Sequence, residues 1–227
     1  MILITGASRG IGKYLLEEFI KTRADVYGTY NSTLPQTDKK HLYYWLNVTD
    51  YKSIESLDIA LGEKLNKIIL INCAGVNYSG FAHKSDRELW KQVIDINLTG
   101  TYNVIREFLP VMREQGYGRI INFSSVVAQK PTPGTSAYSA SKAGLWGLAK
   151  SIAVENASRN ITINNLNLGY FDIGMIHEVS SEFQAAIKKD IPGEKFGEPE
   201  NIFKLINHLI SNDYINGASI DINGGLL

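Results

Sequence analysis

A tyrosine and a lysine four residues apart form the pair with the clearest chemical potential in the sequence. Tyr138 and Lys142 stand in the stretch from Thr135 to Ser158, which is rich in Ala, Ser and Gly and predicts a helix. Residues at positions i and i+4 lie on one helix face, so the phenol and the ammonium are neighbours. A phenol, with an ordinary pKa of about 10, is a poor acid–base catalyst at neutral pH. We expect the ammonium to lower the pKa of Tyr138 toward the working range.

A serine at the end of a predicted strand gives this pair a context, because a Tyr-x-x-x-Lys motif alone occurs by chance in many helices. Ser125 follows the run from Arg119 to Ser124, which is typical of a central strand. A side chain at the C-terminal end of such a strand points into the crevice where parallel sheets bind ligands. The serine and the tyrosine–lysine pair are therefore expected to share one site.

A glycine-rich turn near the start of the chain predicts a phosphate-binding loop. The strand from Met1 to Thr5 runs into Gly6-Ala7-Ser8-Arg9-Gly10-Ile11-Gly12 and then into an amphipathic helix. Glycines let the backbone approach a pyrophosphate, and the helix N-terminus supplies free N–H groups and a positive dipole. Glycine also serves ordinary turns because it tolerates positive φ. The strand–turn–helix context favours a dinucleotide site over a purely structural turn.

The end of the second predicted strand bears on the choice of nucleotide. NAD sites usually carry Asp or Glu there for the ribose 2′-hydroxyl, whereas this chain has Tyr30 followed by Asn31 and Ser32. Arg9 lies in the glycine turn, where a guanidinium can pair with a 2′-phosphate. Both features favour NADP(H) and leave NAD(H) possible. The alternative for Arg9 is a solvated loop charge.

Short apolar runs alternate with longer helical stretches along the whole chain, which predicts βαβ units and a parallel sheet. We expect an α/β fold of the three-layer Rossmann type, with a doubly wound, mostly parallel sheet of about seven strands. Residues 1–227 are expected to form a single NAD(P)-binding domain with an irregular lid segment at about 169–197. The other predicted strands are Val26–Tyr30, Leu42–Leu46, Lys67–Asn72, Ile161–Leu166 and Ala218–Ile222, and the other predicted helices are Tyr51–Leu65, Asp86–Gln115 with a possible break near 97–100, and Glu198–Ser211.

Composition narrows the class of protein. Lys plus Arg and Asp plus Glu number 23 each, so the formal charge is zero and nucleic acid is not an expected partner. No apolar run approaches the length of a membrane span, and the first residues do not resemble a signal peptide. Cys73 is the only cysteine, and the four histidines lack metal-ligand spacing, so we expect no disulfide and no metal. A reducing cytoplasm is the simplest location.

The sequence resembles the short-chain dehydrogenase/reductase family over nearly its whole length. The motifs that carry the resemblance are the Thr5–Gly12 turn, Asn47-Val48, Asn72-Cys73-Ala74-Gly75, Asp95 to Gly100 around Asn97, Ser125 with Tyr138 and Lys142, and Asp221-Ile222-Asn223-Gly224-Gly225. Within the family the chain looks most like bacterial 3-oxoacyl-[acyl-carrier-protein] reductases.

The resemblance implies a role for each motif residue. Tyr138 would exchange a proton with the substrate oxygen, Lys142 would lower the phenol pKa and hold the nicotinamide ribose, and Ser125 would stabilise the substrate oxygen. Asn97 would anchor a water molecule of a proton relay. The alternative is that Asn97 only marks a break in the helix. Ser124 rivals Ser125, but strand alternation and the spacing to Tyr138 favour Ser125. The expected cofactor-binding set is Gly6, Ser8, Arg9, Gly10, Ile11, Gly12, Asn31, Ser32, Asn47, Val48, Asn72, Ala74, Gly75, Tyr138, Lys142, Gly169 and Ile173.

Two departures from the family pattern qualify these roles. Cys73 replaces an asparagine and is expected to be a packing residue rather than a reactive thiol. Leu168 and Ile173 replace the usual proline and threonine after the sixth strand, which removes one hydroxyl contact to the nicotinamide. The lid residues Met175, Ile176, Val179, Phe183, Ile187 and Ile191, with Tyr170 and Phe171, form either an apolar substrate wall or the buried face of a short helix.

The leading functional hypothesis is NADPH-dependent reduction of a small-molecule or carrier-bound carbonyl, with a 3-oxoacyl thioester as the first substrate. The alternatives are a sugar, polyol or secondary-metabolite dehydrogenase of the same family, and a non-catalytic nucleotide-binding homologue. The family usually forms tetramers, so a homotetramer or homodimer is expected, with the helix that carries Tyr138 at the interface.

Overall fold

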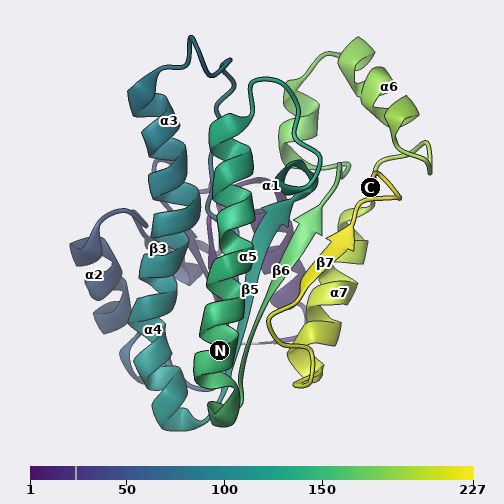
Figure 1. The fold of residues 1–227 in the computed structure, drawn as a ribbon. Helices are drawn as coiled ribbons and strands as arrows, with labels where there is room; N and C mark the ends of the chain where they lie inside the picture. The colour runs from purple at the N-terminus through teal and green to yellow at the C-terminus, as the bar shows by residue number, and fades with distance from the viewer. Residues whose placement is uncertain (24) are drawn as a thin grey trace.

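A seven-stranded parallel sheet forms the centre of the computed structural model, which describes residues 1–23 and 25–227 (Figure 1). The strand order is β3-β2-β1-β4-β5-β6-β7, and all six pairings are parallel. The predicted Rossmann-type sheet is therefore confirmed. The strands are β1 (Ile2–Thr5), β2 (Val26–Tyr30), β3 (Tyr43–Trp45), β4 (Ile69–Asn72), β5 (Gly118–Ser125), β6 (Ile161–Leu168) and β7 (Ser219–Ile222).

Two layers of helices cover the sheet, because each helix buries one apolar stripe against it. Helices α2 (Tyr51–Leu61), α4 (Thr101–Gln115) and α5 (Ser136–Asn156) contribute to the core on one face, and α1 (Gly10–Phe19) and α7 (Pro199–Ser211) contribute to the core on the other. Helix α3 (Arg87–Ile94) continues into α4, and α6 (Ser181–Asp190) stands beyond the ends of β6 and β7 (Figure 1). No helix of the described ranges is long and apolar enough to cross a membrane.

The strand order reverses between β1 and β4, and this reversal positions the site. The chain runs outward from β1 through β2 to β3, and then returns to β4 on the other side of β1. The segments that follow β1 and β4 therefore lead to helices on opposite faces of the sheet, α1 and α4, and leave a crevice at the carboxyl edge. The glycine turn follows β1 and the segment Cys73-Ala74-Gly75 follows β4, so both meet at this crevice.

Two predicted segments differ from the structure. The stretch at 169–197, expected to be irregular, contains a 3-10 turn (Gly174–Glu178) and α6, because the Ser180 hydroxyl accepts a hydrogen bond from Phe183 N and caps the helix. The helical stretch that begins near Asp86 does not break near Asn97. It passes from α3 to α4 through a π-helical turn, Asp95–Gly100, which adds a residue without interrupting the chain direction.

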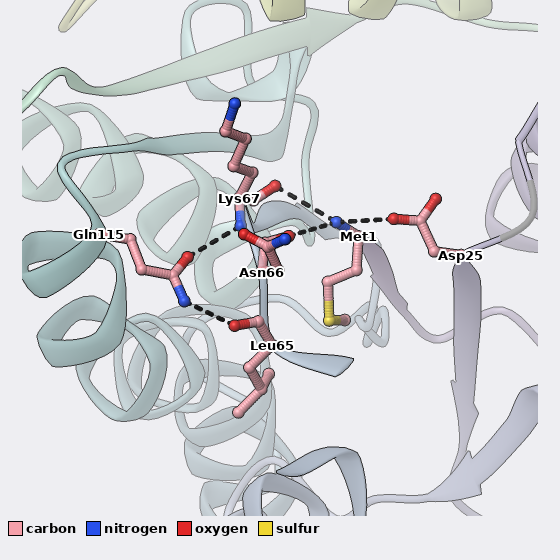
Figure 2. A network of polar contacts seen from close by, with 6 residues as sticks. All are labelled: Met1, Asp25, Leu65, Asn66, Lys67 and Gln115. Atoms are coloured by element: carbon pink, nitrogen blue, oxygen red, sulfur yellow. Dashed lines mark hydrogen bonds and ion pairs between the residues drawn. The ribbon is translucent and has the colours of Figure 1, made fainter. Parts of the chain in front are cut away.

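The amino-terminal ends of β1 and β4 are held together at the edge opposite the crevice (Figure 2). The Met1 nitrogen donates to Asn66 O at 2.5 Å and pairs with the Asp25 carboxylate at 3.0 Å. The Gln115 side chain accepts from Lys67 N at 2.8 Å and donates to Leu65 O at 2.6 Å. These contacts fix the turn before β4, where Lys67 has a positive φ of 44°.

A row of amide side chains crosses the centre of the sheet. Asn72 on β4 donates to Asn122 on β5 at 2.9 Å, and Asn122 donates to Asn165 on β6 at 3.1 Å. Asn165 donates in turn to the Ser219 hydroxyl on β7 at 3.1 Å. These four residues are register partners, so each amide reaches the next strand directly. Buried amides are tolerated here because each one forms a hydrogen bond with a side chain of the neighbouring strand.

Replacement of Asn122 tests this row. Asn122→Ala leaves the Asn72 donor and the Asn165 acceptor without their partner in the core, so we expect the free energy of unfolding to fall by about 3 kcal/mol. Urea denaturation measures this change. Asn66→Ala, at an exposed position, is the matched control and should change stability by less than about 0.5 kcal/mol. Equal stability of the two variants would contradict the role given to the row.

Candidate active site

Two glycines of the glycine turn stand where the backbone leaves no room for a side chain. Gly6 has a φ of 66°, and a Cβ placed on it would lie 2.8 Å from the backbone of Ala74. A Cβ on Gly12 would lie 2.5 Å from the Gly6 carbonyl oxygen. The Thr5 hydroxyl accepts a hydrogen bond from Ala74 N at 3.1 Å and ties the β1 and β4 loops together. Positions 6 and 12 of the turn therefore accept only glycine.

This cradle fits an anionic nucleotide. Helix α1 begins at Gly10 and presents the unpaired N–H groups of its first turn, including those of Ile11 and Gly12. Its first turn contains no acidic residue, so the positive end of the helix dipole is not neutralised. Arg9 precedes the helix without a side-chain cap and is exposed, and Ser8 is half-buried beside it. The turn thus offers donors and one cation for phosphate groups.

The other cofactor candidates line the same edge of the sheet. Asn31 and Ser32 are exposed just beyond β2, and Trp45 Nε1 donates to Asn31 O at 3.0 Å. The Asn47 side chain accepts from Thr49 N and Thr49 Oγ1, at 3.1 and 2.9 Å. Val48 is buried against Gly100, where a Cβ would lie 2.5 Å from Val48 Cγ2.

Lys142 is the most deeply buried ion of the site. Its Nζ donates to the Phe123 carbonyl oxygen at 2.6 Å, near the end of β5, and lies 5.5 Å from the centre of the Tyr138 ring. The residue is 6% exposed. A Cβ on Gly75 would lie 3.7 Å from Nζ, so the β4 loop closes over the ammonium. Burial lowers the pKa of Lys142 to about 8.

The pKa of Tyr138 moves in the direction opposite to that expected from the sequence. Burial raises it to about 12, and the opposing interaction with the Ser125 hydroxyl does not compensate. The expectation that Lys142 lowers this pKa was wrong for this structure, because the Lys142 ammonium is itself desolvated and bonded to Phe123 O. The neighbouring Tyr170 raises the pKa of Tyr138 further. At neutral pH the phenol is protonated and ready to donate.

Asn97 sits in the π-helical turn and locks two segments of the site. Its Oδ1 accepts from Val76 N at 2.8 Å, and its Nδ2 donates to Val76 O at 2.9 Å and to Ser141 Oγ at 3.1 Å. Both hydrogens of the Asn97 side-chain amide thus bond to protein atoms, so a relay water could form a hydrogen bond only to an oxygen atom of Asn97. Its carbonyl oxygen also accepts from Thr101 Oγ1 at 2.9 Å.

Ser141 is a positioning residue that the sequence reasoning missed. It lies inside the Tyr-x-x-x-Lys motif, is fully buried, and donates to the Tyr138 carbonyl oxygen at 2.8 Å while accepting from Asn97. It thus couples the turn of α5 that bears Tyr138 to the π-helical turn. Its spacing of three from Tyr138 was the available signal, since a serine can bond to a helix carbonyl one turn back.

The two serines at the end of β5 have different environments. Ser124 is 3% exposed, donates to the Lys142 carbonyl oxygen at 3.0 Å and accepts from Trp146 Nε1 at 3.1 Å. Ser125 is half-buried, and its hydroxyl interacts with the phenol of Tyr138 and accepts weakly from Val127 N at 3.4 Å. This arrangement favours Ser125 as the serine that meets a substrate.

The segment after β6 lies against the cofactor cradle. A Cβ on Gly169 would lie 2.7 Å from Asn223 Cα, and one on Gly174 would lie 3.3 Å from Gly10 Cα. Leu168 is buried and continues β6, as proline would do less readily. Ile173 is half-buried against the core beneath α1, and its N–H donates to Phe171 O at 2.7 Å.

The lid residues form an apolar cluster beside the phenol. Val126, Val127, Ile176, Ile187, Ile191, Phe196 and Leu226 make up this lid cluster, and Tyr138, Tyr170 and Val179 pack against it. Phe183 is 56% exposed and Phe171 belongs to the core beneath α7, so neither joins it. The side chain of Met175 lies outside the described residues. The cluster is both the buried face of α6 and a wall near Tyr138.

Two negative expectations bear on the chemistry. Burial raises the pKa of the Cys73 thiol, which keeps it protonated and unreactive. Among residues 1–23 and 25–227, no group of three or more His, Cys, Asp and Glu side chains could hold a metal ion. Of the residues expected to be catalytic, Tyr138 and Lys142 are the two whose pKa values are shifted by burial.

Comparison with known proteins identifies the family of this chain. The short chain dehydrogenase family model matches residues 1–184, and the chain belongs to this family of oxidoreductases, which act on CH–OH or C=O groups. The chain is 36% identical to 3-oxoacyl-[acyl-carrier-protein] reductase FabG of Haemophilus influenzae and 31% identical to nodulation protein G of Azospirillum brasilense, in each case over 99% of this chain and 96% of the relative. A crystal structure assigned as a gluconate dehydrogenase from Agrobacterium tumefaciens superposes with a TM-score of 0.87 at 26% identity, covering 100% of this chain and 95% of that one.

The buried Lys142 predicts a pH-dependent stability. Its pKa is about 8 in the folded chain and 10.5 ordinarily, so between these values the unfolded chain binds more protons and folding gains stability as pH rises. Lys142→Met lacks this gain. From about pH 7 to about pH 9.5, wild type should gain about 2 kcal/mol relative to the variant in urea unfolding. Lys150→Met, at an exposed position on the same helix, should run parallel to wild type. Parallel profiles for Lys142→Met would contradict its burial as an ion.

Proposed function

We propose that this protein reduces a carbonyl group with NADPH, with a 3-oxoacyl thioester as its first substrate class. The observation that carries the proposal is the convergence of Ser125, Tyr138 and Lys142 beside the glycine cradle. The FabG-type relatives support the thioester, because their name specifies 3-oxoacyl chains on a carrier protein. The lid cluster supports it too, since an acyl chain needs an apolar wall near the phenol.

Each residue has a defined part in this reduction. Bound nicotinamide supplies the hydride, and the protein positions it and controls the proton. Tyr138, which is protonated at neutral pH, donates its phenolic proton to the substrate oxygen. Because burial raises the pKa of this phenol, the donation needs a positive charge close to the phenolate when the site is occupied. Ser125 donates a hydrogen bond to the same oxygen and stabilises its developing charge. Lys142, whose Nζ lies 5.5 Å from the centre of the Tyr138 ring, would hold the ribose hydroxyls of the nucleotide.

The cofactor set proposed for this chain comprises the cradle residues Gly6, Ser8, Arg9, Gly10, Ile11 and Gly12, the residues Asn31, Ser32, Asn47 and Val48 near the adenosine, and Asn72, Ala74, Gly75, Gly169 and Ile173 near the nicotinamide. One buried atom supports the last group: Asn72 Oδ1 has no hydrogen-bond partner in the described residues. Such an atom is costly unless a ligand or water satisfies it. The absence of a carboxylate after β2 supports NADPH over NADH.

A second candidate is oxidation or reduction of a sugar or polyol, favoured by the structural likeness to the protein assigned as a gluconate dehydrogenase. The half-buried phenol of Tyr170, next to Tyr138, offers a polar contact that a hydroxylated substrate would use. A non-catalytic nucleotide-binding role is the third candidate, suggested by Leu168 and Ile173.

A cytoplasmic homo-oligomer, tetramer or dimer, is part of the proposal. Its exposed surface on α5 includes Gly147 and Val154, and sedimentation of the purified chain tests it.

Substitution of Tyr138 tests the chemistry. NADPH consumption is measured against acetoacetyl thioesters, keto sugars, quinones and simple ketones, with NADH in parallel. Tyr138→Phe should lower kcat about 10²- to 10⁴-fold, because the proton donor is lost, while NADPH binding stays within about twofold. Tyr214→Phe, at a residue that is 97% exposed, is the control. Wild-type turnover by Tyr138→Phe would refute the assignment, and turnover confined to keto sugars would favour the second candidate.

Substitution of Arg9 tests the nucleotide preference. Arg9→Ala should weaken NADPH about 10- to 100-fold, the loss expected for a charge-assisted hydrogen bond, with little change for NADH. Titration of the nucleotides by calorimetry measures both affinities. Arg23→Ala, an exposed arginine just beyond the far end of α1, serves as the matched control. An equal loss for the two nucleotides would remove Arg9 from the 2′-phosphate site.

A further inference from the structure

The Trp146 indole joins two strands at the base of the active site. Its Nε1 donates to Ser124 Oγ on β5 at 3.1 Å and to Asn167 Oδ1 on β6 at 3.0 Å. Ser124 and Asn167 are 3% and 0% exposed, so this shared N–H is sheltered from water. Ser124 passes the connection on by donating to the Lys142 carbonyl oxygen at 3.0 Å.

The edge strand β7 completes the connection from the other side. Asp221 Oδ1 accepts from Asn167 Nδ2 at 2.8 Å and from Gln129 Nε2 at 2.7 Å. Ser124, Asn167 and Asp221 are register partners on β5, β6 and β7, so they form one row across the sheet. Helix α5, which carries Trp146, packs along β5 and β6, the first two of these strands (Figure 1).

These contacts close into a ring that contains Ser125. Four hydrogen bonds link Ser124 to Gln129, and they pass through Trp146, Asn167 and Asp221 in that order. The polypeptide backbone from Gln129 back to Ser124 closes the ring and includes Ser125. We propose that this hydrogen-bonded ring is the positioning device for the Ser125 hydroxyl. The inference rests on the proposed function, in which Ser125 stabilises the substrate oxygen.

Ser125 needs such a device because its local restraint is weak. It is the last residue of β5, and its hydroxyl accepts from Val127 N at 3.4 Å, which is long for a hydrogen bond. The ring holds the segment at both ends, one residue before Ser125 and four residues after it. A displacement of about 1 Å at a catalytic group costs up to about a hundredfold in rate, so an anchored segment has functional value.

A double-mutant cycle tests the proposal. Trp146→Phe keeps the aromatic ring and removes the N–H, and we expect kcat to fall about tenfold with KM for NADPH unchanged. In a Ser125→Ala background the same substitution should have no further effect, because the group it positions is gone. An unchanged kcat in Trp146→Phe, or a repeated tenfold loss in the Ser125→Ala background, overturns the proposal.

Two further variants separate the ring from a local effect of the indole. Asp221→Ala opens the ring at its exposed side and should lower kcat as Trp146→Phe does. Trp90→Phe is the matched control, since Trp90 Nε1 also donates to a serine hydroxyl, Ser136 Oγ at 3.1 Å, outside the ring. Full activity in Asp221→Ala, or an equal loss in Trp90→Phe, would contradict positioning by the ring.

A readout without turnover keeps this inference separable from the proposed function. If the wild-type protein reduces no carbonyl, the proposed function fails, and the ring is tested by titration of the phenol. Because the Ser125 hydroxyl lowers the pKa of Tyr138, Trp146→Phe and Asp221→Ala should both raise that pKa, and Trp90→Phe should not. An identical phenol titration in wild type and both ring variants overturns the inference.

Discussion

Burial of the Lys142 ammonium is the constraint on which the rest of the site depends. A charge taken out of water must be compensated locally, and here its nearest compensation is the Phe123 carbonyl oxygen at the tip of β5. This bond requires β5 and α5 to keep a fixed separation. The surrounding polar contacts serve that requirement: Ser124 reaches the Lys142 carbonyl, and Asn97 and Ser141 hold the turn of α5 that bears Tyr138.

The same burial sets the protonation states of the site. An ammonium with a pKa of about 8 and a phenol with a pKa of about 12 are both protonated at neutral pH. The protonated phenol is the form that donates to a carbonyl oxygen, and the phenolate is the form that accepts a proton from an alcohol. A raised pKa makes the phenol a weaker acid, so a positive charge next to it is needed to stabilise the phenolate after the proton is donated.

Much of the fold and the outline of the site could be predicted from the sequence, because both depend on local patterns. The apolar run of β4, the glycine turn and the spacing from Ser125 to Tyr138 each specify their own geometry. The pKa of Tyr138 could not be predicted in this way, since it depends on how the lid cluster packs against the phenol. The sequence pattern predicts that Lys142 is a neighbour of Tyr138 and cannot indicate that its ammonium is bonded to Phe123 O instead.

Long-range contacts account for the other differences. The sequence left open whether the lid residues form a substrate wall or the buried face of a short helix, because they pack on Val126, Val127 and Leu226, which are distant in sequence. The sequence gives no sign that Asn167, Asp221 and Trp146 belong to one network. Only the register of β6 and β7 aligns Asn167 and Asp221 with Ser124, the residue to which Trp146 donates. Polar roles of this kind arise from topology, so residue type and spacing alone do not reveal them.

Burial of the phenol keeps Tyr138 protonated in the folded protein at neutral pH. A pH titration of the tyrosine ring carbons by NMR, with Tyr138→Phe used to assign the resonance, measures this directly. The Tyr138 signal should keep its phenol position past pH 10 and titrate near pH 12. A midpoint below the ordinary value of 10 would contradict it, and would mean that Lys142 controls the phenol directly.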